Sequence, residues 1–226
     1  MVMRGYNNSI NDISCMIIGI DEAGRGCIIG PMVIAAASID PMREYLLKDL
    51  GVKDSKKLSP KQRETIYPQV LKLCEVKRDF ISAEQITRQM DKDNLNEIEA
   101  IHIARLLSDA PDDATAFIDS PDNIPANFGK RILKHLKSRP KLVCENKADD
   151  KHLIVGAASI VAKVERDREI EKIKEELGVD FNSGYTSDPY TIAFLARHSH
   201  EPKVRKYLRL KWATLKNLQQ RKIMEY

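Results

Sequence analysis

The chain has few cysteines and no paired cysteine motif. Its four cysteines are scattered, none of them in a Cys-x-x-Cys pair. This spacing excludes a local zinc knuckle, and without a secretory signal we expect no disulfide framework. The five histidines also lack the paired spacing of zinc ligands. The sequence therefore does not predict a structural zinc site of the cysteine or histidine type.

Long hydrophobic segments are also missing. The longest apolar stretch, residues 27–39, is interrupted by Gly30 and Pro31 and is too short to span a bilayer. Residues 1–11 are polar and do not have the pattern of a signal peptide. Hydrophobic residues nevertheless make up 42% of the 226 residues, enough for a sizeable core. We expect a cytoplasmic, monomeric protein without membrane contact.

A strong overall charge is likewise absent, because the formal net charge is only +4. The distribution says more than the total. From Arg197 to Arg221 there are eight lysines and arginines and one acidic residue, Glu201. This basic run has two readings, a solvated helical face or a flank that binds phosphates.

Strand and helix patterns alternate along the chain. Short apolar runs predict strands at residues 15–20, 32–39, 77–82, 114–118 and 141–144. Helices are expected at residues 59–73, 94–107, 128–136 and 153–177, with shorter ones after Pro189. Pro68 should end or kink the first of these helices. The alternation favours an α/β domain at 15–178, between a flexible leader at 1–14 and a helical C-terminal subdomain at 179–226.

Acidic residues follow three of the expected strands. Asp21 comes after the first, Asp119 after the fourth, and Asp149 just beyond the fifth. Strand ends are where α/β sheets bind ligands, so these carboxylates are expected to converge. Glu22 can join them only if its strand bends, because adjacent strand residues point to opposite faces. Oxygen ligands without histidine or cysteine suit Mg²⁺ or Mn²⁺, whereas the alternative is that these acids are solvated turn residues.

Six short motifs occur in a characteristic order. They are DEAGRG at 21–26, DSKKL at 54–58, DSP at 119–121, NKAD at 146–149, AASIVAKVERD at 157–167 and GYTSDP at 184–189. Together they resemble the ordered motifs of ribonuclease HII (type 2 ribonuclease H) in its archaeal form. The resemblance covers residues 16–198, about four-fifths of the chain.

The resemblance implies a fold, a reaction and a set of catalytic residues. The fold would be an α/β ribonuclease H-like mixed sheet flanked by helices, with a helical C-terminal subdomain. The reaction would be hydrolysis of the RNA strand of RNA–DNA hybrids, and cleavage 5′ of ribonucleotides embedded in duplex DNA. Two Mg²⁺ or Mn²⁺ ions would assist it, leaving 3′-OH and 5′-phosphate ends. The implied catalytic and metal-binding residues are Asp21, Glu22, Asp119 and Asp149.

Substrate contacts follow from the same resemblance. Its glycine-arginine-glycine turn would recognise the ribose 2′-OH, and its tyrosine would contact the same hydroxyl. Glycine suits this task because it lets backbone N–H and C=O groups approach a sugar closely. The implied substrate-binding residues are Gly24, Arg25, Gly26, Ser55, Lys56, Lys57, Lys163, Arg166 and Tyr185. For Lys163 and Arg166, bracing of the site is the alternative to contact with the nucleic-acid backbone.

The chain departs from the family pattern at three positions. Asn146 stands where the family usually has histidine, Thr186 where it has proline, and Asp150 adds an acid beside Asp149. The last leaves the fourth metal ligand open by one position. Two other functions fit parts of the pattern: another nuclease of the ribonuclease H fold, or a protein that binds hybrids without cutting them.

The last residues have a second motif with two readings. Gln220, Ile223 and Tyr226 have the spacing of a glutamine followed by two apolar groups, as in ligands of sliding clamps. The alternative is the end of an amphipathic helix. A sliding clamp is thus the one protein partner that the sequence suggests.

Overall fold

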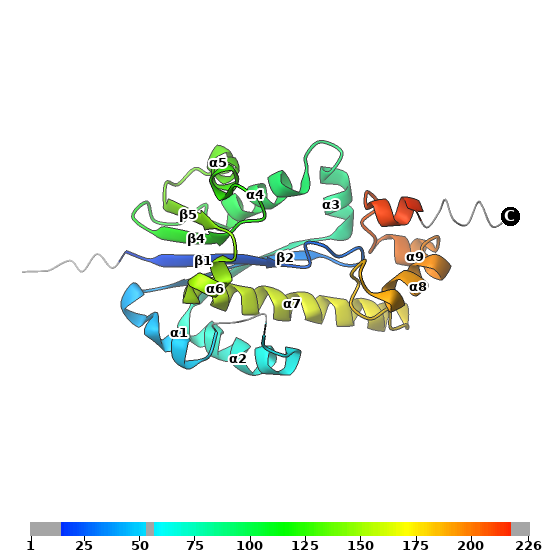
Figure 1. Cartoon of the computed structure of the whole chain (residues 1–226), viewed down its shortest axis with the longest axis horizontal. Helices are drawn as coiled ribbons and strands as arrows, with labels where there is room; N and C mark the ends of the chain where they lie inside the picture. The colour runs from blue at the N-terminus through cyan, green and yellow to red at the C-terminus, as the bar shows by residue number, and fades with distance from the viewer. Residues whose placement is uncertain (1–14, 53–56, 218–226) are drawn as a thin grey trace, which may run out of the picture.

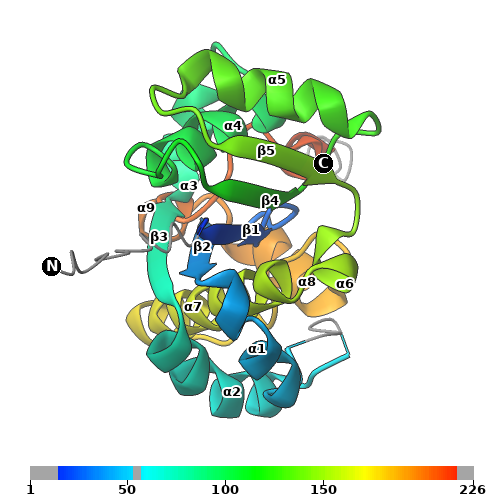
Figure 2. The ribbon, with the colours of Figure 1, turned by 90° about the vertical axis from the view of Figure 1, so that its left-hand side faces the viewer.

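The protein is built on one mixed sheet (Figures 1 and 2). The computed structural model describes residues 15–52 and 57–217, and in these residues five strands pair in the order β3-β2-β1-β4-β5. The strands are β1 (Ile17–Ala23), β2 (Met32–Ile39), β3 (Glu75–Ile81), β4 (Thr115–Asp119) and β5 (Lys141–Glu145). The first three are antiparallel neighbours, whereas β4 and β5 continue the sheet parallel to β1.

Helices cover both faces of this sheet. On one face lies α7 with α1 and α2, and on the other lie α4 and α5, as Figure 2 shows. The helix bounds are η1 (Pro41–Arg43), α1 (Tyr45–Asp49), α2 (Pro60–Leu73), α3 (Ala83–Gln89), α4 (Leu95–Leu106), α5 (Pro125–His135), α6 (Ala148–Lys151), α7 (Leu153–Leu177), α8 (Pro189–His198) and α9 (Pro202–Arg205). Among the described residues, none of the helices is both long and apolar enough to cross a membrane.

The N-terminal half of α7 lies directly against β1. A Cβ atom added at Gly19 would come within 2.3 Å of the Ile154 carbonyl, so only glycine permits this approach. Residues 154–162 of α7 are all buried, as is typical of a helix segment that is apolar nearly all round. The helix ends at Gly178, whose φ of 67° is the left-handed conformation of a glycine C-cap.

The C-terminal helices pack at the far end of α7, where Figure 1 shows α8 and α9. Their apolar side chains share a cluster with Ile28 and Ile29, which follow β1, and with Ile173 on α7. Two isolated β-bridges connect the same parts, Cys27 with Tyr185 and Ile29 with Leu208. The segment after β1 is therefore held by residues from the end of the chain.

One local expectation is wrong, and one of two expected effects of a proline is excluded. The first strand does not stop or bend at Asp21, because its pairing with β2 continues through Glu22 to Ala23. The helix α2 continues through Pro68 to Leu73 without ending there. Tyr67 and Val70, on either side of this proline, are buried, and this packing offsets the backbone hydrogen bond that proline cannot make.

Candidate active site

Asp21 and Asp119 lie side by side on neighbouring parallel strands. The register pairs Ile20 of β1 with Ile118 of β4, and each aspartate is the next residue along its strand. Asp119 Oδ1 accepts a 2.8 Å hydrogen bond from the backbone N–H of Ala148, which brings the start of α6 to the same strand end. The structure thus brings together two of the three acids that were expected at strand ends.

The two acids that follow Ala148 differ in exposure. Asp149 is only 2% exposed, whereas Asp150 is exposed to solvent. Asp149 directly follows Ala148, whose backbone N–H donates to Asp119, so the buried acid of the pair is also the one next to this contact.

Glu22 lies on the face of β1 opposite to Asp21, because the strand stays extended. Ser159 on α7 donates a hydrogen bond to Asp21, and Lys163 on the same helix attracts it. Glu22 instead meets the charges of Glu99 on α4 and of Arg25. Asp119 acts on both Asp21 and Glu22, so the acids form one electrostatic cluster that reaches across the strand.

Burial and mutual repulsion raise the pKa values in this cluster. Burial is the largest cause for Asp21, whose pKa lies well above its ordinary value, and the charge of Glu22 adds to it. Burial, then the charges of Glu99 and Asp119, raise the pKa of Glu22 to about 8. A buried set of like charges is costly unless cations neutralise it. Carboxylate oxygens are also the donors that Mg²⁺ and Mn²⁺ prefer, so these residues fit divalent ions in chemistry and charge.

The cluster is not a closed set of ligands. In the described part of the chain, no three acid, histidine or cysteine side chains are grouped as ligands of one ion. What the structure establishes is a set of carboxylates that share burial and electrostatic coupling at one end of β1 and β4.

The glycine-arginine-glycine turn follows the acids directly. Gly24 has a φ of 81°, and a Cβ there would meet the Pro31 carbonyl at 2.6 Å, so both conformation and space require glycine. Gly26 is exposed and lies next to Tyr185. A Cβ atom added at Gly26 would be 3.9 Å from the Tyr185 ring. The turn and Tyr185, which are 160 positions apart, are therefore neighbours, as the sequence motifs implied.

The Tyr185 ring packs against the side chain of Arg166. The Arg166 guanidinium lies 4.9 Å from the centre of the Tyr185 ring and donates a 2.8 Å hydrogen bond to Cys27 Sγ. Burial, followed by interaction with Cys27, raises the pKa of Tyr185 to about 12, so its hydroxyl stays protonated at neutral pH. Arg166 is 5% exposed, which favours its bracing role over contact with solvent-exposed phosphates.

Two residues that the sequence interpretation missed hold the Arg25 side chain. Glu99 on α4 is fully buried and accepts a 2.8 Å hydrogen bond from Arg25 Nε. Asn96, one helical turn earlier, also accepts a hydrogen bond from Arg25. The sequence signal was an acid between Ile98 and Ala100, both buried, since charged side chains rarely occupy core positions without a partner.

The lysines of the implied site have mixed positions. Lys163 Nζ donates a 2.6 Å hydrogen bond to Ser159 Oγ and lies close enough to Asp21 to lower its pKa. Lys57 is exposed. Ser55 and Lys56 lie outside the described residues, as do all three residues of the expected clamp motif, Gln220, Ile223 and Tyr226.

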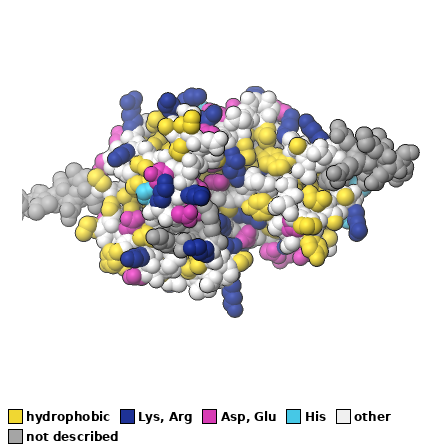
Figure 3. All heavy atoms as spheres, in the orientation of Figure 1, with side chains coloured by type: hydrophobic (Ala, Val, Ile, Leu, Met, Phe, Trp, Pro, Cys, Tyr) yellow, Lys and Arg dark blue, Asp and Glu magenta, His cyan; other side chains and the backbone are white. Residues whose placement is uncertain are grey.

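The basic run near the C-terminus is partly neutralised by acids from other segments. Lys206 pairs with Glu176 on α7, and Lys211 pairs with Asp91 at 2.5 Å. Arg209 is fully buried. On the face seen in Figure 3, Lys and Arg side chains are interspersed with acidic and hydrophobic ones. Within the described part of the run, two lysines are thus paired with acids from other segments and one arginine is buried.

Comparison with known proteins gives a consistent family. The family model described as Ribonuclease HII matches residues 18–215. Ribonuclease HII of Methanococcus maripaludis strain C6 is 40% identical over 222 residues, 96% of this chain and 92% of that protein. Ribonuclease HII of Nanoarchaeum equitans is 48% identical over 195 residues, 86% and 92% of the respective chains.

Solved structures agree with these relatives. A PCNA:RNase HII complex from Archaeoglobus fulgidus matches with a TM-score of 0.79 and 41% identity, over 87% of this chain and 95% of that one. Bst-RNase HIII in complex with Mn²⁺ matches with a TM-score of 0.78 and 25% identity, over 92% and 70%. The chain belongs to the ribonuclease HII family, whose members are metal-dependent hydrolases that cleave RNA in RNA–DNA hybrids.

Proposed function

We propose that this chain hydrolyses the RNA strand of RNA–DNA hybrids and also cuts duplex DNA on the 5′ side of an embedded ribonucleotide. The observation that carries the proposal is the adjacency of Asp21 and Asp119 at the ends of two parallel strands, beside the turn at 24–26. The carboxylates proposed to bind metal would then lie next to the turn proposed to read the sugar. The products would carry 3′-OH and 5′-phosphate ends.

Asp21, Glu22, Asp119 and Asp149 would hold two Mg²⁺ or Mn²⁺ ions. Their burial and mutual repulsion support this, and so does the Mn²⁺ complex of the related Bst-RNase HIII. Such ions would lower the pKa of a water nucleophile and neutralise the charge of the leaving oxygen. Lys163, hydrogen bonded to Ser159 beside Asp21, would keep that carboxylate ionised and in place.

Recognition of ribose would depend on the turn and the tyrosine. The backbone of Gly24, Arg25 and Gly26 would contact the 2′-OH. Tyr185, whose ring lies next to Gly26, would contact the same hydroxyl. Arg166 supports this assignment because it fixes the Tyr185 ring through a cation–π contact. Ser55, Lys56 and Lys57 would contact phosphates of the substrate.

A sliding clamp is the proposed protein partner. Gln220, Ile223 and Tyr226 supply the sequence motif, and the PCNA complex of the Archaeoglobus fulgidus relative supports it. Such a tail would recruit the enzyme to DNA without taking part in the reaction.

The experiment that tests this function uses three duplexes of the same sequence. They contain one ribonucleotide, an all-RNA strand opposite DNA, or DNA alone, and each is incubated with the protein and Mg²⁺ or Mn²⁺. We expect cleavage of the first two, with the cut 5′ of the single ribonucleotide, and none of the third. Cleavage of the all-DNA duplex would indicate a nuclease that does not read the 2′-OH, and binding without cleavage would indicate a non-catalytic protein.

A further inference from the structure

Arg209 is a fully buried arginine whose guanidinium lies against the turn at 24–26. Its Nη2 donates to the Gly24 carbonyl at 2.6 Å, its Nη1 to the Arg25 carbonyl at 2.7 Å, and its Nε to the Gly30 carbonyl at 3.3 Å. Across residues 15–52 and 57–217, no carboxylate forms an ion pair with it. The buried positive charge therefore acts on backbone carbonyls, two of which belong to the turn.

These carbonyl contacts determine where two N–H groups point. The Gly24 carbonyl and the Arg25 N–H belong to one peptide group, as do the Arg25 carbonyl and the Gly26 N–H. In a trans peptide the C=O and N–H bonds point in opposite directions, so carbonyls turned toward Arg209 turn these N–H groups away from it. Neither N–H has an acceptor within the described part of the chain, whereas the next one, of Cys27, donates to the Gly24 carbonyl.

The charge of Arg209 also strengthens these donors. A cation that bonds a carbonyl polarises the whole peptide group, and the N–H of that peptide becomes a better donor in a low-dielectric surrounding. Burial lowers the pKa of Arg209 to about 10, which still leaves it protonated at neutral pH.

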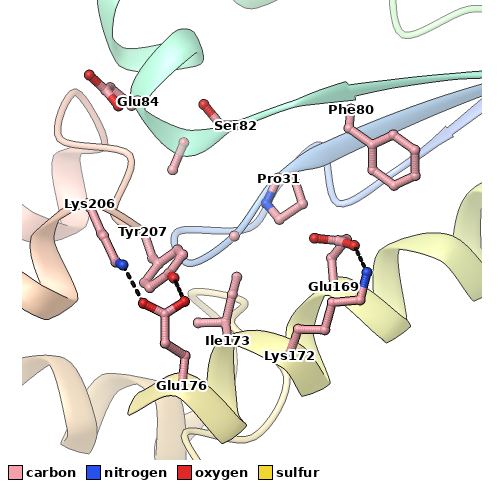
Figure 4. Close-up of a pocket in the computed structure, with 12 residues that line it drawn as sticks. Pro31, Phe80, Ser82, Glu84, Glu169, Lys172, Ile173, Glu176, Lys206 and Tyr207 are labelled. Atoms are coloured by element: carbon pink, nitrogen blue, oxygen red, sulfur yellow. Dashed lines mark hydrogen bonds and ion pairs between the residues drawn. The ribbon is translucent and has the colours of Figure 1, made fainter.

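The segment that carries Arg209 is itself fixed on two sides. The Gly30 N–H donates to the Tyr207 carbonyl at 2.9 Å, and the Arg209 N–H donates to the Ile28 carbonyl at 3.0 Å. Figure 4 shows Lys206 and Tyr207 both reaching Glu176 on α7, at the edge of a cavity of about 440 Å³. None of the four acids proposed to bind metal lines this cavity, so it is separate from the candidate active site.

We propose that Arg209 is a positioning residue for ribose recognition, which orients the N–H groups of Arg25 and Gly26 toward the 2′-OH of the substrate. This inference rests on the proposed function, in which the turn reads the sugar. It adds a residue from the C-terminal segment, 185 positions from Gly24, to a recognition element at the start of the chain. A residue that only fills the core would stabilise the protein without affecting the choice between ribose and deoxyribose.

The test measures binding of two duplexes that differ in one 2′-OH. Dissociation constants for the single-ribonucleotide duplex and the all-DNA duplex are measured with Ca²⁺ as the divalent ion, and gels confirm that both stay intact. In Arg209→Met the preference for the ribonucleotide should fall by about tenfold, the equivalent of ~1.4 kcal/mol. Affinity for the all-DNA duplex should change by less than about twofold, since phosphate contacts dominate it.

Two further variants separate positioning from stability. Arg209→Lys keeps the charge but cannot donate to three carbonyls at once, so its preference should lie between wild type and Arg209→Met. Arg78→Met is the control, because Arg78 is a partly buried arginine that bonds Glu165 and Tyr67 and has no bond to the turn among the described residues. It should lose stability and keep the wild-type preference.

The outcomes distinguish this inference from the proposed function. Equal affinity of the wild-type protein for both duplexes would refute reading of the 2′-OH itself. A wild-type preference that survives in either folded Arg209 variant would overturn only the role of Arg209. Hydrogen exchange on the wild-type protein gives a measurement independent of variant folding. The amides of Arg25 and Gly26 should be protected by the ribonucleotide duplex and not by all-DNA, and equal protection by both would overturn the inference.

Discussion

The side chain of Arg25 is bonded to Glu99, with Arg25 Nε donating to Glu99 Oε2 at 2.8 Å. Glu99 is fully buried, and its Oε1 has no hydrogen-bond partner within the described residues. The Arg25 side chain is thus directed toward α4, while its carbonyl is held by Arg209. Within the described residues the Arg25 backbone N–H has no acceptor, so it is the Arg25 group that we propose to contact the substrate.

The first prediction concerns Glu99 and pH. Burial raises the pKa of Glu99 to about 7, above the ~4.3 of an unfolded glutamate. At a pH between these two values, the Glu99 carboxyl is protonated in the folded protein and ionised in the unfolded protein. Its contribution to the free energy of unfolding is therefore fully present below pH ~4.3 and is lost as the pH rises through about 7. Glu99→Gln cannot ionise, and relative to wild type its stability should increase from pH 5 to pH 8.5.

The measurement is the melting temperature of metal-free wild type and Glu99→Gln across this range. The difference should grow by several °C, on the order of 2 kcal/mol. A difference that does not depend on pH would show that Glu99 is already ionised in the folded protein at pH 5.

The second prediction tests the acid cluster through Asp119→Asn. Asparagine keeps the shape and can still accept the hydrogen bond from Ala148, but it removes a charge proposed to hold the divalent ions. Cleavage with Mg²⁺ should fall by on the order of 10³-fold or more, while the melting temperature of the metal-free protein stays similar or rises. Near-normal turnover of a folded variant would remove the proposed metal role.

The third prediction compares two neighbouring acids. Asp149 is buried and follows Ala148, which is hydrogen bonded to Asp119, whereas Asp150 is exposed. Asp149→Ala should therefore abolish cleavage, and Asp150→Ala should retain most of it. Cleavage rates of the single-ribonucleotide duplex, measured side by side, check this. The reverse result would move the fourth metal ligand by one residue.

The fourth prediction concerns Tyr185. Tyr185→Ala removes a ring that lies beside Gly26 and over Arg166, so recognition of one defined ribose should suffer most. Activity on a single embedded ribonucleotide should fall about tenfold further than activity on an all-RNA strand, which offers several registers for binding. Equal losses on both substrates would mean that the ring only supports the structure.

The fifth prediction concerns the tail, which lies beyond the described residues. Deletion of residues 223–226 should abolish binding to a sliding clamp and leave cleavage of a short duplex unchanged. Arg221 and Lys222 should make the binding weaken with salt. Loss of stability or of basal cleavage in the truncated protein would show that the tail belongs to the fold.

Local sequence signals were enough for much of the architecture. The β-branched run at 32–39 coincides with β2, and the proline-free stretch at 153–177 coincides with α7, which ends at Leu177 as expected. These features depend on periodicity and capping within a few residues, so they can be read without knowing what packs against them. The ordered motifs also identified the family, and with it the expected sheet.

Tertiary structure alone decided how the turn at 24–26 is held and which way the acids face. Glu22 shares its face with Glu99 because β1 stays paired with β2, and Arg209 reaches Gly24 across 185 positions. Two lysines of the basic run near the C-terminus pair with Glu176 and Asp91, which lie far away in sequence. No local pattern contains these partners, since hydrogen bonds and ion pairs between distant segments arise only when the helices pack against the sheet.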